Sequence, residues 1–283
     1  MLKCFANAKI NLLLDVTGRD ENGYHTVNNI MQTVSLQDTV NLSCDCDGIK
    51  VAYDDGYPIT DKDICLKAAK EYEKLASKKI NADIFINKVI PTAAGLGGNS
   101  SAAAGVLALL NKKYGYLTKE QLLEIAASLG ADVPFFLIGG TALCEHYGEI
   151  ITSISKMPQM YVVIAKKGNK GTTAEMYQKI DSSGAYKNAD LEKMLWAIET
   201  QDLQNILPLM QNVFEDVASK ESLELKKIIA DCGADVAMLS GSGPAVFGLF
   251  CEEKVAEECC KKLCDMGVSA YLCFMADSGI IFE

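Results

Sequence analysis

A glycine-rich stretch occupies residues 91–101, between an apolar segment that predicts a strand and an alanine- and leucine-rich segment that predicts a helix. Glycine lets the backbone approach an anion without a Cβ in the way, and consecutive N–H groups in such a turn form an anion-binding nest. The following helix begins with free N–H groups and the positive end of its dipole. The stretch therefore predicts a phosphate-binding loop, although glycine content alone leaves close packing of the helix on a sheet as an alternative.

The glycine spacing excludes two familiar nucleotide motifs. No Gly-Lys-Ser/Thr follows the loop, and Gly95, Gly97 and Gly98 lack the third spacing of the dinucleotide fingerprint. The hydroxyls of Ser100 and Ser101 can cap the helix, bind phosphate or reach a metal ion. The candidate phosphate-binding residues are Pro91, Thr92, Ala93, Ala94, Gly95, Leu96, Gly97, Gly98, Asn99, Ser100 and Ser101.

Hydrophobic periodicity predicts strands and helices along the rest of the chain, with a polar turn at residues 17–24. The predicted strands are residues 2–14, 33–43, 81–90, 161–165, 236–240, 245–250 and 269–275. The predicted helices are residues 63–77, 100–111, 119–129, 173–180, 189–198, 202–216, 221–231 and 252–266, the third capped by Thr118 and closed by Gly130. This order favours an α+β protein with domains at residues 1–155 and 156–283.

The charge balance narrows the range of partners. The formal net charge of −10 disfavours nucleic acid and anionic membranes, although one local electropositive pocket is enough to hold a nucleotide. No apolar run approaches the roughly 18 residues that span a bilayer, and no basic region with a cleavage signal opens the chain. We therefore expect a cytoplasmic protein that binds small molecules rather than nucleic acid or membrane.

The cysteines and histidines do not form a metal-binding pattern. The chain has 11 cysteines and two histidines, but no Cys-x-x-Cys pair. A zinc site needs about four ligands at workable spacing, so reduced thiols in a reducing cytosol are the simpler interpretation. We expect no direct protein ligand to a metal ion, with Ser101 as the one candidate.

Two charged residues stand in apolar surroundings. Asp132 lies between Gly130 and the apolar run 133–138, and Lys9 interrupts an apolar N-terminal segment. An unpaired carboxylate in such a place is costly, so we expect Lys9 to be the cationic partner of Asp132. The alternatives are a capping role for Asp132 and a role for Lys9 as a charge that guards an edge strand.

Three motifs in order resemble those of the GHMP kinases, a family that includes galactokinase, homoserine kinase and mevalonate kinase. They are the glycine loop, residues 8–12 (Ala-Lys-Ile-Asn-Leu) and residues 239–247 (Leu-Ser-Gly-Ser-Gly-Pro-Ala-Val-Phe). The resemblance implies an N-terminal ribosomal-protein-S5-like domain, a C-terminal ferredoxin-like α/β sandwich and an active site in the cleft between them. It also implies ATP and Mg²⁺ as cofactors and a hydroxyl group as phosphoryl acceptor.

Residues 20–25 (Asp-Glu-Asn-Gly-Tyr-His) and 130–136 (Gly-Ala-Asp-Val-Pro-Phe-Phe) sharpen the resemblance to one branch of that family. This branch phosphorylates the 2-hydroxyl of 4-(cytidine 5′-diphospho)-2-C-methyl-D-erythritol in non-mevalonate isoprenoid biosynthesis. The resemblance implies that Lys9 and Asp132 are catalytic. It also implies that the cytidine and the rest of the substrate are held by Asn11, Tyr24 and His25, with Ser242 and Gly243 in support.

The sequence departs from the family pattern at two positions of the loop region. Asn99 stands where relatives have a third glycine, and Ala102 where they carry an acidic or amide residue. Asparagine tolerates unusual backbone angles better than other non-glycine residues. Two alternatives therefore stay open: another GHMP kinase acting on a mevalonate-type acid, homoserine or a sugar, and a catalytically weak binding protein of the same fold. Either a monomer or a weak homodimer is compatible with the sequence.

Overall fold

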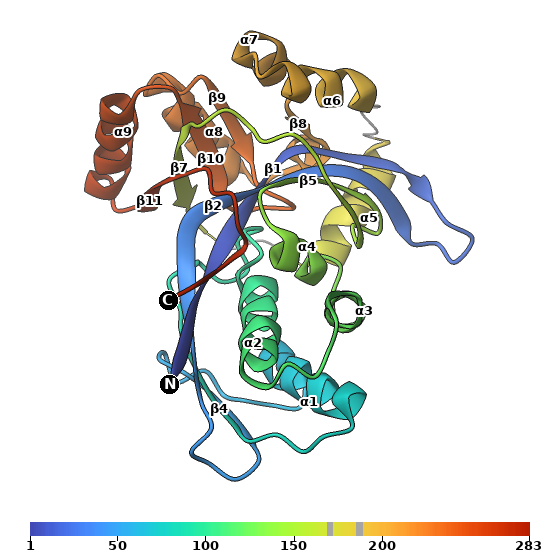
Figure 1. Ribbon diagram of the computed structural model, residues 1–283. Coiled ribbons are helices and arrows are strands. Elements are labelled where there is room, and N and C mark those ends of the chain that lie inside the picture. The colour runs from blue at the N-terminus through green and yellow to red at the C-terminus, as the bar shows by residue number, and fades with distance from the viewer. Residues whose placement is uncertain (169–171, 185–188) are drawn as a thin grey trace.

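The computed structural model describes residues 1–168, 172–184 and 189–283, which build two β-sheets with helices packed on them (Figure 1). The larger sheet is organised on a long antiparallel hairpin of β1 (Leu2–Arg19) and β2 (His25–Ser43). Their registered pairs run from Leu2 with Leu42 to Arg19 with His25. The predicted strands at 2–14 and 33–43 are therefore present but longer, because residues as far as Arg19 still pair across the hairpin and the turn is confined to residues 20–24.

The larger sheet has eight strands in the described part of the chain, and its main path is β12-β1-β2-β4-β3. Strands β5 and β6 continue from β2, and β8 pairs in parallel with β1. The bounds of these strands are Ile49–Tyr53 (β3), Ala82–Asn87 (β4), Thr141–His146 (β5), Ile150–Ser153 (β6), Gln211–Asn212 (β8) and Ile280–Phe282 (β12). Of these, only β4 was predicted; β6, β8 and β12 have four residues or fewer, which is too short for a clear period-2 pattern.

Four helices accompany the larger sheet on the side where the first core cluster lies (Figure 1). They are α1 (Ile64–Ala76), α2 (Gly98–Tyr114), α3 (Lys119–Leu129) and α4 (Val133–Ile138). The predicted cap of α3 is confirmed: the Thr118 side chain accepts from the Gln121 amide, the Gln121 side chain accepts from the Thr118 amide, and Gly130 ends the helix. Helix α2 is buried over most of its middle, which holds the N-terminus of the helix firmly at the glycine loop.

The smaller sheet is antiparallel, in the order β11-β7-β10-β9. Its strands are Tyr161–Lys166 (β7), Val236–Leu239 (β9), Val246–Phe250 (β10) and Ser269–Phe274 (β11). The helices of this half are Thr173–Ser183 (α5), Leu191–Thr200 (α6), Leu203–Ile206 (α7), Lys220–Asp231 (α8) and Glu253–Asp265 (α9). Every residue of β10 is buried, because helices and the larger sheet cover this strand on both faces.

The predicted helix at 202–216 is wrong. The segment divides into α7, a 3-10 turn at Leu207–Leu209, β8 and a second 3-10 turn at Val213–Val217. Pro208 lacks the N–H that a continuous helix needs, and the Asn212 side chain donates to the carbonyls of Leu239 and Gly241. Because the helix is broken here, β8 can pair with β1, and Asn212 can bind the C-terminal glycine turn.

The two halves of the chain share strands. Strand β12 pairs with β1 from Cys4 with Phe282 to Ala6 with Ile280, so the C-terminus returns to the N-terminal strand (Figure 1). A division at residue 155 stays a prediction, with β8 and β12 as the later segments that join the first sheet.

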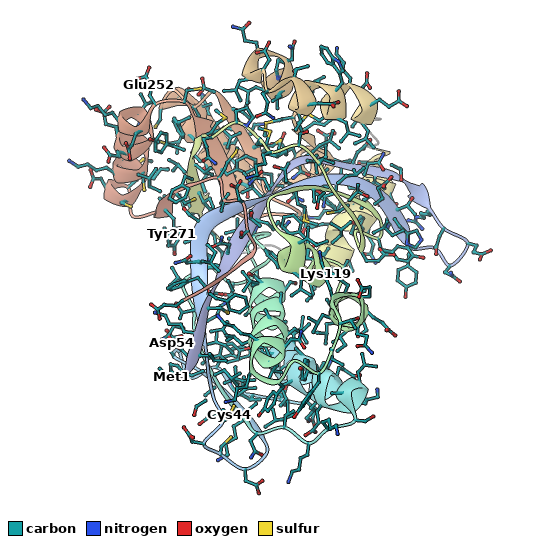
Figure 2. The ribbon with its side chains drawn as sticks, in the orientation of Figure 1. Met1, Cys44, Asp54, Lys119, Glu252 and Tyr271 are labelled. Atoms are coloured by element: carbon teal, nitrogen blue, oxygen red, sulfur yellow. The ribbon has the colours of Figure 1, made fainter. Side chains whose placement is uncertain are left out.

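The exposed charged residues Asp54 and Glu252 lie toward the outside of the molecule (Figure 2). Within the described ranges, no helix combines the length and apolar character needed to cross a membrane.

We expect Phe247→Ala to lower the free energy of unfolding by about 3 to 5 kcal/mol, because its fully buried ring lies in the cluster between the sheets. The same substitution at Phe85, which is 42% exposed on β4, is the matched control and should cost far less. Chemical denaturation of both variants measures the difference, and equal losses would contradict this assignment of the core.

Candidate active site

The glycine loop turns sharply between β4 and α2. Gly95 and Gly97 have φ angles of 83° and 71°, and Gly97 is the N-terminal cap of α2. Residues 91–100 line a cavity of about 300 Å³ together with Lys88 and Thr173. Backbone N–H groups at a helix start are suited to an anion. All but the last of the sequence-predicted loop residues therefore border one hollow.

Ser101, the last of the predicted loop residues, is directed elsewhere. Its side chain is fully buried, and Oγ donates to the carbonyl of Asn7 at 2.7 Å. Ser100, by contrast, lines the cavity. The structure thus uses the Ser101 hydroxyl to fasten α2 to β1, whereas the Ser100 hydroxyl is the one beside the loop cavity.

The C-terminal glycine turn packs directly on the loop. The Ala245 amide donates to the Ala94 carbonyl at 3.1 Å, and Ser240 Oγ donates to the Gly95 carbonyl at 3.0 Å. A Cβ on Gly95 would collide with the Ser240 carbonyl. Gly95 is therefore required both for its backbone angle and for this approach, which joins segments 145 residues apart.

Lys9 is buried at the centre of this junction, with 3% of its surface exposed. Its Nζ donates to Asn11 Oδ1 at 2.7 Å, and the same oxygen accepts from the Gly241 amide at 2.7 Å. Asn11 Nδ2 in turn donates to Asn29 Oδ1 at 2.8 Å. Burial lowers the pKa of Lys9, and the negative charge of Asp132 opposes the shift.

Asp132 occupies the N-terminal cap position of α4, but its side chain makes no capping hydrogen bond. It lines a cavity of about 170 Å³ with Lys9, Asn11, Gly95 and Gly97. The sequence predicts that Lys9 is the cationic partner of Asp132. In the described part of the chain no ion pair of 4.0 Å or less joins them, although the carboxylate influences the lysine electrostatically. The ammonium is hydrogen-bonded to Asn11 instead.

Tyr24 and His25 stand at the far end of the β1–β2 hairpin. The Tyr24 ring is 67% exposed and meets Tyr147 edge-on, with 5.8 Å between centroids. His25 Nε2 lies 2.7 Å from Asp181 Oδ1, and its ring stacks on Tyr177 at a centroid distance of 4.5 Å. Neither predicted residue lines the cavity of Lys9 and Asp132 itself, but each contacts an aromatic residue that does.

Several residues of the two cavities were missed by the sequence analysis, among them Lys88, Tyr147, Thr173 and Tyr177. Burial raises the pKa of Tyr177 to about 12, with a contribution from Asp132. The Tyr147 hydroxyl donates to Asp20, whose carboxylate also accepts from the Tyr24 amide. Thr173 and Tyr177 lie one helical turn apart on α5. The one sequence signal for them is therefore the helical period, which places both residues on the same face of the helix.

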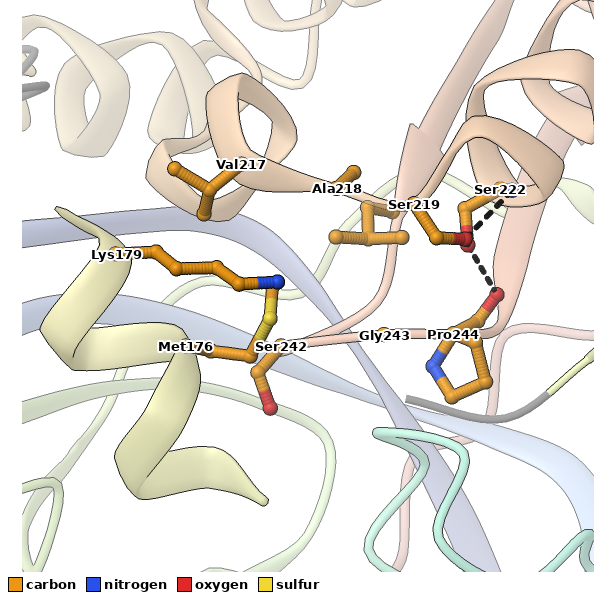
Figure 3. Close-up of a pocket in the computed structure, with 10 residues that line it drawn as sticks. Met176, Lys179, Val217, Ala218, Ser219, Ser222, Ser242, Gly243 and Pro244 are labelled. Carbon is orange, nitrogen blue, oxygen red and sulfur yellow. Dashed lines mark hydrogen bonds between the residues drawn. The ribbon is translucent and has the colours of Figure 1, made fainter. Parts of the chain in front are cut away.

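A third cavity, of about 130 Å³, lies beside the C-terminal turn (Figure 3). Met176 and Lys179 reach into it from α5, opposite Ser219 and Ser222 at the start of α8. Ser222 Oγ donates to the Pro244 carbonyl at 3.1 Å. The predicted residues Ser242 and Gly243 both line this cavity, and Ser242 also borders the cavity of Lys9 and Asp132.

Family models match both halves of the chain. The model described as GHMP kinases N terminal domain matches residues 63–140, and that described as GHMP kinases C terminal matches residues 194–269. The chain belongs to the GHMP kinase family, has its two-domain fold and is a phosphotransferase that acts on an alcohol group.

Curated relatives place the chain more finely. It is 36% identical over 267 residues to the 4-diphosphocytidyl-2-C-methyl-D-erythritol kinase of Clostridium tetani, with 93% of this chain and 95% of the relative covered. It is 38% identical over 263 residues to the enzyme of the same name from Clostridium kluyveri, with 91% and 94% covered. Within the GHMP kinases, the chain therefore belongs to the family of 4-diphosphocytidyl-2-C-methyl-D-erythritol kinases.

Solved structures agree with this placement. A crystal structure of 4-(cytidine 5′-diphospho)-2C-methyl-D-erythritol kinase matches with a TM-score of 0.83 and 28% identity, covering 97% of this chain and 99% of the other. A homoserine kinase from Cytophaga hutchinsonii matches with a TM-score of 0.74 and 19% identity, covering 100% and 97%. The second likeness concerns the fold alone.

We expect Gly95→Ala to weaken nucleotide binding more than tenfold, because the new Cβ would push the loop away from the Ser240 carbonyl. Gly115→Ala is the matched control: its φ of 64° is also left-handed, but nothing lies within 4 Å of the new Cβ. Both changes carry a backbone cost of about 1 to 2 kcal/mol. Calorimetric titration with ATP separates them, and an equal effect of the two substitutions would refute the proposed role of the contact.

Proposed function

We propose that this cavity transfers the γ-phosphate of ATP to the 2-hydroxyl of 4-(cytidine 5′-diphospho)-2-C-methyl-D-erythritol, a step of non-mevalonate isoprenoid biosynthesis. The observation that carries the proposal is that Lys9 and Asp132 line one cavity with Gly95 and Gly97 of the glycine loop. A carboxylate, a cation and a nest of backbone amides within one hollow are the groups that phosphoryl transfer requires. The names of the relatives supply the identity of the acceptor.

The nucleotide would lie with its phosphates in the cavity of the glycine loop. The backbone N–H groups at the start of α2 would bind the phosphate oxygens, with Lys88 at the margin. Lys88 is held by an ion pair with the fully buried Asp38, which also accepts from the amides of Val89 and Ile90. This brace keeps the lysine beside the loop rather than in solvent.

Bound Mg²⁺ would find oxygen donors in each of two cavities that share Gly95, Gly97 and Thr173. Asp132 and Ser100 border adjoining cavities, and hard oxygen ligands are those that Mg²⁺ prefers. When bound, Mg²⁺ would neutralise charge on the transferring phosphate, with most of its remaining ligands supplied by phosphate oxygens and water. Ser101, the ligand considered from sequence, already donates to Asn7.

The reaction requires the acceptor hydroxyl to lose its proton. Asp132 would accept that proton, since its side chain is not committed to capping α4. The Lys9 ammonium, held by Asn11, would stabilise negative charge that develops on the attacking oxygen. Because Lys9 is bound through Asn11, the space beside Asp132 is left to the alcohol.

The cytidine end would lie among the aromatic residues at the hairpin. Tyr24, Tyr147 and Tyr177 offer rings for packing on a base, and His25 offers an imidazole edge for hydrogen bonding. Tyr147 and Tyr177 also line the cavity of Asp132. One continuous substrate could therefore extend from the aromatic residues to the carboxylate.

We expect Asp132→Asn to lower kcat by about 100- to 10,000-fold while ATP affinity changes little, because it removes the proton acceptor and keeps the shape of the side chain. Stopped-time ADP assays and calorimetric titration measure the two quantities. Asp277→Asn is the control, since Asp277 lies outside both cavities and is half-exposed. Near-normal turnover by Asp132→Asn would remove the residue from the mechanism.

We expect ADP release with the cytidine-diphosphate methylerythritol substrate and little with the same substrate lacking cytosine. The loss should reach about tenfold or more in kcat/KM, because base stacking and hydrogen bonding are both removed. A panel containing mevalonate, homoserine and a hexose tests the other acceptors of the GHMP family. Faster turnover of any of these would overturn the proposed substrate, and ATP and cytidine binding without ADP release would indicate a binding protein.

A further inference from the structure

The carboxylate of Asp181 bridges two residues of the β1–β2 hairpin. Its Oδ1 lies 2.7 Å from His25 Nε2, and its Oδ2 forms an ion pair with Arg19. The side chains of His25 and Asp181 are 12% and 21% exposed, so water competes only weakly for the histidine contact. Asp181 belongs to α5, which packs against the hairpin from the other half of the chain.

Helix α5 presents two groups to the same imidazole. Tyr177 and Asp181 are four residues apart, so they lie on one face of the helix. The Tyr177 ring stacks on His25 with an interplanar angle of 20°, while Asp181 contacts the ring edge at Nε2. The face and the edge of the imidazole are thus fixed by one rigid element, which restricts both its position and its rotation.

Arg19 balances the charge of this contact. It is the only arginine in the sequence, where every other basic residue among the 27 is lysine. A guanidinium stays charged at any ordinary pH and pairs with carboxylates in a fixed planar geometry. Arg19 pairs with His25 in the last register position of the hairpin, so it approaches Asp181 from the same end as the imidazole.

We propose that Asp181, supported by Arg19, is a positioning residue that holds His25 in the tautomer with its proton on Nε2. A carboxylate can only accept a hydrogen bond, so Nε2 must donate. In a neutral imidazole the other nitrogen, Nδ1, is then an acceptor. Among the described residues no hydrogen bond occupies Nδ1, which leaves that nitrogen for a ligand.

The tautomer of His25 determines which pyrimidine base can form a hydrogen bond with Nδ1. Cytosine presents an exocyclic amine, a donor, where uracil presents a carbonyl, an acceptor. An acceptor at Nδ1 therefore favours cytosine. With uracil, Nδ1 would face a carbonyl oxygen, and neither of these two acceptors could donate a hydrogen bond. This inference rests on the proposed function, and it adds a residue of α5 that controls the base preference without touching the base.

The protein contains its own spectroscopic reference. Its second histidine, His146, contacts Glu149 through Nδ1 at 2.6 Å, so the same reasoning places its proton on Nδ1, whereas that of His25 is on Nε2. Selective ¹⁵N labelling of histidine, at a pH of about 8 where imidazoles are mostly neutral, should show one ring of each tautomer. In Asp181→Asn, the His25 signals should shift toward a mixture of tautomers while those of His146 stay unchanged. Unchanged His25 signals would overturn the proposal.

The kinetic test compares the cytidine substrate with its uridine counterpart. In Asp181→Asn, the ratio of the two kcat/KM values should fall by about tenfold or more, mainly through KM, because the contact to the base is equally strong before and during the reaction. Arg19→Lys should fall between wild type and Asp181→Asn. Glu192→Gln, which neutralises an exposed carboxylate of α6, is the control and should leave the ratio unchanged.

The two tests separate the proposal from the function on which it rests. A wild-type protein that phosphorylates neither compound refutes the substrate, while the NMR comparison still decides the role of Asp181. A wild-type enzyme that prefers cytidine, with the same preference in Asp181→Asn, refutes the positioning role alone. If the asparagine variant does not fold, Asp181→Ser removes the carboxylate with a smaller side chain and is read by the same two measurements.

Discussion

The contact between two glycine turns holds the candidate site together. The loop around Gly95 and the turn around Gly241 lie against each other, joined by a bond from the Ala245 amide to the Ala94 carbonyl and one from Ser240 Oγ to the Gly95 carbonyl. Such proximity is available only where no Cβ intervenes. Because one turn belongs to the larger sheet's side of the molecule and the other joins β9 to β10, this contact also fixes how the two halves meet. The cavity of Lys9 and Asp132 exists because of that alignment.

A buried ammonium sits directly beside this contact, and its environment explains the polar residues around it. Removing Lys9 from water is costly unless its N–H groups are satisfied. Asn11 supplies the oxygen at 2.7 Å and uses the same atom to bind Gly241, so the lysine and the C-terminal turn are held by one side chain. Asp132 acts on Lys9 through its charge rather than through a direct ion pair. Polar groups placed in this way need little rearrangement when a ligand arrives.

The sequence was sufficient for features that are local. The glycine loop, the Thr118 cap and the strands on either side of the C-terminal turn follow from residue type and spacing, and all are present. Features that depend on packing between distant segments could not be predicted from the sequence. The segment 202–216 has helical periodicity, yet Asn212 is drawn into a strand by partners at Leu239 and Gly241. Likewise, nothing near Tyr177 in the sequence indicates that it lies against His25, 152 positions earlier.

Residues along one face of helix α5 connect the cavity of the glycine loop with His25 at the hairpin. Thr173, Tyr177 and Asp181 recur every four residues, so they form one stripe along the helix. Thr173 lines both the loop cavity and the cavity of Asp132, whereas Asp181 reaches His25 at the hairpin. A substrate lying along this stripe would have its phosphoryl acceptor near the N-terminal end and its base near the C-terminal end. The N-terminal end of α5 also carries the positive end of the helix dipole, which favours the location of the phosphates there over the reverse orientation.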